Sequence, residues 1–100
     1  MTQKGGHMFA VFVVVEGAGE SSGNALLNDV IIPRARQAGA RSGVWIFRGE
    51  GVGTSVVTFD DEASAKGLAG RLTVGQPVVP DQAGSPVVRS VEVCPVVGSF

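Results

Sequence analysis

Apolar residues gather in four short runs that are typical of β-strands. The runs cover residues 8–16 (MFAVFVVVE), 41–48 (RSGVWIFR), 54–59 (TSVVTF) and 87–97. The chain holds eighteen valines against four leucines and three isoleucines. Valine is stiff at its first side-chain torsion and suits a pleated sheet better than a helix. Between the second and third runs, GEGVG at 49–53 predicts an antiparallel hairpin with Glu50 and Gly51 at its tip.

Between the strand patterns lie two segments with helical spacing. In residues 25–38, Leu27, Val30 and Ile31 recur at three- and four-residue intervals and form one apolar stripe. Asn24 or Ser22 suits the N-cap of this helix. Pro33 falls inside it and should kink or split it, because proline removes a hydrogen bond and clashes one turn back.

The second helical segment covers residues 62–72 (EASAKGLAGRL) and follows the candidate caps Asp60 and Asp61. The elements then run strand, helix, strand, strand, helix, strand. This order predicts an α+β, ferredoxin-like βαββαβ fold, with both helices on one face of a four-stranded antiparallel sheet. We expect residues 8–100 to form this single domain, and residues 1–7 to be a flexible leader.

Both faces of the predicted sheet are largely apolar. Phe9, Val11, Val13 and Val15 alternate with Met8, Ala10, Phe12 and Val14, and residues 44–47 and 87–94 also alternate. Two helices cover one face only, and soluble monomers rarely expose a large apolar patch. We therefore expect a homodimer that pairs the exposed sheet faces in a barrel. The alternative is that the long connection at 73–86 or the C-terminal tail folds over the bare face.

Charge and cysteine content narrow the function classes. Eight basic and nine acidic residues are spread without runs, so the chain shows no electrostatic footprint for nucleic acid or an anionic membrane. No apolar run reaches the ~20 residues that span a bilayer. One cysteine cannot form an internal disulfide and fits a reducing compartment, so we expect a cytoplasmic protein.

A longer stretch carries a family resemblance. Residues 31–69, IIPRARQAGARSGVWIFRGEGVGTSVVTFDDEASAKGLA, combine a helix with a proline, a strand, a hairpin, a strand ending in Phe59 and Asp60, and an alanine-rich helix. This pattern resembles the dimeric α/β-barrel proteins of the antibiotic-biosynthesis-monooxygenase-like group, over about residues 8 to 97. The resemblance implies a ferredoxin-like homodimer. Members of the group include cofactor-independent oxygenases of aromatic substrates, haem-degrading enzymes and proteins without an assigned reaction.

Cofactor-independent oxygenation needs an apolar pocket and a group that removes a proton or stabilises the resulting anion. The candidate pocket residues are Trp45, Phe47, Phe12 and Phe59, with Arg34, Arg48 and Asn28 as polar partners and Glu92 as a base. Core packing is the alternative interpretation of the aromatic residues, and a solvated position that of the charged ones.

Other motifs point to no further chemistry. The only histidine, His7, precedes the first strand, whereas the similar haem-degrading enzymes carry their ligand on or after the second helix. We expect neither a haem nor a metal site. Cys94 next to Pro95 is interpreted as an inert strand cysteine, and the glycines at 17–23 and 49–53 as turns.

The sequence therefore leaves two functions open. The first is a monooxygenase without metal or flavin that acts on a small aromatic or hydrophobic substrate. The second is a non-catalytic module of the same fold that binds a small ligand or only self-associates. A cavity of ~300 Å³ or more beside Trp45, with a convergent polar group, would favour an enzyme or a binder.

Overall fold

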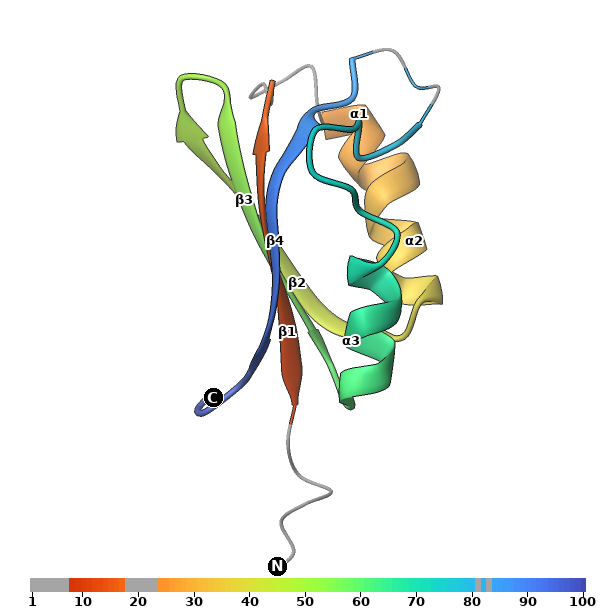
Figure 1. The fold of residues 1–100 in the computed structure, drawn as a ribbon, viewed down its shortest axis with the longest axis vertical. Coiled ribbons are helices and arrows are strands. Elements are labelled where there is room, and N and C mark those ends of the chain that lie inside the picture. Colours follow the sequence, from red (N-terminus) through yellow and green to blue (C-terminus); the bar gives the residue numbers. More distant parts are fainter. Residues whose placement is uncertain (1–7, 18–23, 81, 83) are drawn as a thin grey trace, which may run out of the picture.

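The computed structural model describes residues 8–17, 24–80, 82 and 84–100, so the expectation for residues 1–7 lies outside it. An antiparallel four-stranded sheet forms one layer of an α+β fold (Figure 1). Its strands are β1 (Phe9–Glu16), β2 (Ala40–Gly49), β3 (Val52–Phe59) and β4 (Val87–Pro95). Their order across the sheet is β2-β3-β1-β4, which places β1 and β3 at the centre. This arrangement is compatible with the ferredoxin-like fold.

The helical segment before β2 changes type along its length. It begins as α1 (Asn24–Leu26), continues as the π-helix η2 (Leu27–Ile31) and ends as α2 (Ile32–Gln37). The Ile32 N–H donates to the Leu27 carbonyl, five residues back. Pro33, predicted to kink or split the helix, directly follows this wider turn. A π turn is one way to accommodate a ring that has no N–H and would crowd the preceding turn.

Two local sequence signals appear in the structure as expected. The Asp61 carboxylate accepts a hydrogen bond of 2.7 Å from the Ser64 N–H and caps α3 (Glu62–Ala69). At the β2–β3 hairpin tip, Glu50 and Gly51 have φ values of 56° and 77°. Positive φ at both central residues matches the right-handed twist of the flanking strands. The helix ends at Ala69 rather than at residue 72. After Ala69 the backbone hydrogen bonds span three residues, from the Arg71 N–H to the Leu68 carbonyl and from the Leu72 N–H to the Ala69 carbonyl.

The fourth strand departs from the predicted alternation. Its register against β1 shifts between Val14 and Val15, so that Arg89 is an extra residue in β4. The shift places Val88 opposite Val15, while Val91 lies opposite Val13. Because of the extra residue, the side chains of β4 before the bulge point to the opposite face from the one that strict alternation predicts. The simple alternation expected for residues 87–94 is therefore wrong before the bulge.

The helices cover one face of the sheet and leave the other bare (Figure 1). The core lies under the helices and contains Val11, Val57, Phe59, Ala65 and Val88, all at most 3% exposed. On the other face, neighbouring strands align residues in rows, and five of the six residues in two of these rows are apolar. One row joins Val44, Val56 and Phe12, and the next joins Ile46, Thr54 and Val14. We call these six residues the open face.

The two segments that could have covered the open face lie elsewhere. The connection between α3 and β4 packs on the helical side, where Val79 is 3% exposed. In the C-terminal tail, Val97 and Phe100 are fully exposed. Within the described residues the open face therefore has no cover from its own chain, and Phe12, Val44 and Ile46 are 39%, 56% and 49% exposed.

Candidate functional site

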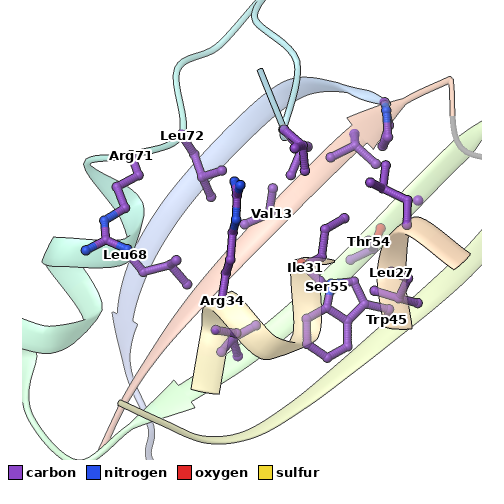
Figure 2. Close-up of a pocket in the computed structure, with 18 of the residues that line it drawn as sticks. Val13, Leu27, Ile31, Arg34, Trp45, Thr54, Ser55, Leu68, Arg71 and Leu72 are labelled. Atoms are coloured by element: carbon purple, nitrogen blue, oxygen red, sulfur yellow. The ribbon is translucent and has the colours of Figure 1, made fainter. Parts of the chain in front are cut away.

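A cavity of about 730 Å³ lies between the sheet and the helical layer (Figure 2). Its volume is within the range of ~300–1,000 Å³ that is usual for small-molecule sites. Four parts of the chain contribute to its wall: the strands β1 to β3, the segment from α1 to α2, the end of α3 and the connection after it. The principal side chains are Val13, Val15, Leu26, Leu27, Ile31, Arg34, Trp45, Phe47, Ser55, Val57, Leu68, Arg71, Leu72, Val78 and Val79.

The indole of Trp45 is positioned by a glycine of its own strand. A Cβ atom added at Gly43 would lie 2.6 Å from two carbons of the indole ring and 3.6 Å from a methyl group of Val57. Only glycine leaves this space free, because real Cβ atoms do not approach other atoms so closely. The ring can therefore fold back over β2 and lie along the sheet, where it presents a broad apolar surface to the cavity.

Beside the indole, β3 supplies a hydroxyl group to the cavity wall. Ser55 is the register partner of Trp45, lines the cavity and is 8% exposed. No hydrogen bond of its hydroxyl to another described group is present. The preceding Thr54 also borders the cavity, but its side chain belongs to the open face, because successive residues of a strand point to opposite faces. Buried hydroxyls usually have hydrogen-bond partners, so this part of the wall has unused hydrogen-bonding capacity.

Two arginines line the cavity from different parts of the chain. Arg34 belongs to α2, and Arg71 follows α3. In Figure 2 both lie on the side of the cavity where Leu68 and Leu72 are found, whereas Trp45 lies on the other side. Within the described chain, neither guanidinium forms an ion pair or a side-chain hydrogen bond. Both residues line the cavity and are also exposed to solvent, so they border its opening.

The connection after α3 closes the cavity on a third side. Hydrogen bonds attach it to the edge strand β4, with the Gly75 N–H donating to the Val88 carbonyl and the Val88 N–H to the Gln76 carbonyl. The Ser85 hydroxyl accepts from the Val79 N–H at 3.0 Å. These bonds hold Val79 in a buried position in the cavity wall.

The residues predicted as pocket candidates lie in three different environments. Trp45 and Phe47 line the cavity. Phe59 is fully buried in the core outside the wall, while Phe12 and Glu92 are register partners on the side of the sheet that has no helices. Arg48 and Asn28 are exposed and do not line the cavity. The part that each plays in binding or catalysis stays a prediction.

Sequence reasoning did not find Arg71, Ser55 or the connection at 73–86 as parts of the site. Arg71 lies near the end of the predicted helix at 62–72, where a basic residue favours the helix dipole and marks no site. Ser55 was one polar residue in a strand, and nothing in the spacing marked it as a partner of Trp45. The connection has no periodic pattern from which its position could be predicted. Hydrogen bonds to β4 hold it against the cavity.

The described cavity wall is poor in groups that transfer protons or bind metals. Arg34 and Arg71 are its ionisable side chains, and it contains no described carboxylate or histidine. Among the described residues, no group of three or more histidine, cysteine, aspartate or glutamate side chains could hold a metal ion. The arrangement is suited to holding an apolar molecule and to stabilising negative charge.

Comparison with known proteins does not assign the chain to a family. It matches no protein-family model, no curated protein and no solved structure. The described helices are all too short or too polar to span a membrane. The resemblance to the dimeric α/β-barrel group thus has no support beyond the α+β fold itself, and the arguments on function depend on the geometry of the cavity and of the sheet.

Proposed function

We propose that this protein binds a small, largely apolar molecule, aromatic in part, in the cavity between its sheet and helices. The observation that carries the proposal is the cavity of about 730 Å³ beside Trp45, with the hydroxyl of Ser55 and two guanidinium groups in its wall. A well-formed apolar pocket with a few convergent polar groups is the general form of a small-molecule site. A sheet packed solidly against its helices would have supported a purely structural protein.

Binding is favoured over catalysis by the composition of the described wall. General-base catalysis needs a group of suitable pKa within hydrogen-bond reach of the proton that it removes, and arginine does not serve because it stays protonated. The wall offers no described carboxylate or histidine. It offers instead a flat indole, apolar side chains and donors of hydrogen bonds, which orient a ligand without transforming it.

Oxygenation without metal or flavin is the second candidate function. The observation that favours it is the presence of Arg34 and Arg71 in an apolar cavity, where cationic donors would stabilise the anion of a phenol or hydroquinone. Reaction of a phenol with one molecule of oxygen would give a quinone and water. The test is oxygen uptake with 1-naphthol above the rate without protein, and uptake equal to that of the buffer would exclude this reaction for that substrate.

We further propose that two copies pair through the open face, as in a dimeric α/β barrel. Phe12, Val44 and Ile46 are 39–56% exposed in the single chain, and the rows that contain them run across three strands. At the β4 side, Ser90 and Glu92 are the register partners of Val14 and Phe12 and supply a polar border. An apolar centre with a polar rim is the usual anatomy of a protein interface. A dimer mass of about 20 kDa, twice the chain mass of 10.2 kDa, is expected in solution.

The binding proposal is tested with a neutral aromatic dye, N-phenyl-1-naphthylamine. Trp45 is the only tryptophan of the chain and lines the cavity. Energy transfer from its indole to the dye therefore reports binding nearby. We expect saturable transfer in the wild-type protein and its loss in Ser55→Leu, whose larger side chain fills the space beside Trp45. Absence of saturable transfer, or equal transfer in Ser55→Leu, would contradict binding in the cavity.

A further inference from the structure

We infer that the ligand of the cavity carries an anionic group, such as a carboxylate or sulfonate, which Arg34 and Arg71 bind at the mouth while its aromatic part lies against Trp45. This inference depends on the proposed ligand-binding function. It adds the chemical class of the ligand and its orientation.

The first argument is the unbalanced charge of the cavity. Arg34 and Arg71 bring two positive charges to its wall, and the described wall contains no acidic residue. The ion pairs of the described residues involve neither arginine: they join Arg41 with Asp60, Lys66 with Glu62, and Arg89 with Glu16. Two guanidinium groups thus lie in the cavity wall, and no carboxylate of the described residues pairs with them.

The second argument is that the two arginines and the indole of Trp45 lie on different sides of the cavity. The arginines lie on the side of Leu68 and Leu72, and Trp45 lies on the opposite side in Figure 2. Arginine side chains commonly place their apolar stems along a hydrophobic surface and keep the charged head in contact with water. A ligand with one aromatic end and one anionic end would satisfy both sides at once, with the anion kept near the solvent.

The third argument is the geometry of guanidinium recognition. Arginine presents a planar set of N–H donors that fits the oxygens of a carboxylate or sulfonate in a bidentate manner. Because Arg34 belongs to α2 and Arg71 follows α3, an anion between them would join two parts of the wall. The hydroxyl of Ser55 remains available for a second polar group deeper in the cavity.

The test compares two dyes that differ by one sulfonate. N-phenyl-1-naphthylamine is neutral, and 8-anilinonaphthalene-1-sulfonate carries the anion on the same ring system. Dissociation constants of both are measured by energy transfer from Trp45 for the wild type, Arg34→Met and Arg71→Met. Methionine retains an apolar stem without charge. The matched control is Arg36→Met, because Arg36 is an exposed arginine of α2 that does not line the cavity.

We expect each cavity variant to weaken binding of the sulfonate dye by about tenfold, the effect of one charge-assisted hydrogen bond. Binding of the neutral dye should stay unchanged, and Arg36→Met should affect neither dye. Rising salt should weaken binding of the sulfonate dye alone.

The outcomes separate the two proposals. Equal weakening of both dyes in the arginine variants would show that the arginines act only as part of the apolar wall, and would overturn the inference. No change with either dye would overturn it as well, while saturable binding of the neutral dye would leave the binding function intact. Failure of the wild type to bind either dye would contradict the proposed function itself.

Discussion

The two faces of the sheet are built from the same strands but differ in how they are covered. On the helical face, Val11, Val57 and Phe59 are at most 3% exposed, yet a cavity of about 730 Å³ remains next to them. On the open face, mostly apolar side chains form rows across three strands, and none of the described residues covers them. One face therefore encloses space, and the other offers a surface.

This difference suggests a division of roles between the faces. A concave, enclosed site suits a small molecule, whereas an extended apolar surface suits another protein surface. Because alternate residues of a strand point to opposite faces, one short strand would serve both proposed roles. Under these proposals, neighbouring residues such as Phe12 and Val13 contribute to different surfaces, and substitutions at adjacent positions should have different consequences.

The largest expected effect is on stability, and it differs between Phe59 on the helical face and Phe12 on the open face. Phe59→Ala should lower the free energy of unfolding by roughly 3–5 kcal/mol, because it leaves a cavity in the fully buried core. In dilute protein, Phe12→Ala should lower the free energy of unfolding by less than about half of the loss in Phe59→Ala, because Phe12 is 39% exposed in the single chain. Urea unfolding at two protein concentrations measures both values. Equal losses for the two variants in dilute protein would contradict the difference in burial.

A charged residue on the open face should break the proposed dimer. Ile46→Lys would place an unpaired ammonium group in each half of the interface, which we expect to weaken dimerisation by at least about 2 kcal/mol, or roughly thirtyfold. Mass in solution should fall toward that of one chain. Val97→Lys is the control, because Val97 is fully exposed in the tail. A wild-type protein that is monomeric at all concentrations would disprove the pairing.

The smallest expected effect concerns the space on the helical face. Ser55→Leu adds apolar volume beside Trp45 and removes a hydroxyl that has no hydrogen bond to another described group. Its free energy of unfolding should be unchanged or raised by up to about 1 kcal/mol, although it blocks the dye site. Thermal unfolding measures the change. A loss above about 2 kcal/mol would indicate that the residue is packed rather than adjacent to open space.

Much of the local structure followed from the sequence. The valine-rich runs predicted the strands, Asp60 and Asp61 were the candidate helix caps of which Asp61 is the one used, and Glu50 with Gly51 marked the hairpin tip. These features depend on residues close in the chain, so they can be read from short windows. The bulge at Arg89 left no such signal, because an extra residue in a strand is defined only by the register of its neighbour β1.

The candidate site was predicted only in part. Trp45 and Phe47 were expected at a pocket, and both lie in the cavity wall. Arg71 and Ser55 were not expected there, since they come from a helix end and a strand that sequence spacing does not relate. The contribution of Gly43 also depends on contact with the indole of Trp45, which a pattern of hydrophobic residues does not reveal.

By itself, then, the sequence determined the strands, the helical segments and their order, because hydrophobic periodicity, caps and turn residues act over a few neighbouring positions. Tertiary structure alone decided where space was left between the sheet and the helices, and which polar side chains surround it. Those features arise when segments far apart in the chain pack together, and their side chains do not fill the volume completely.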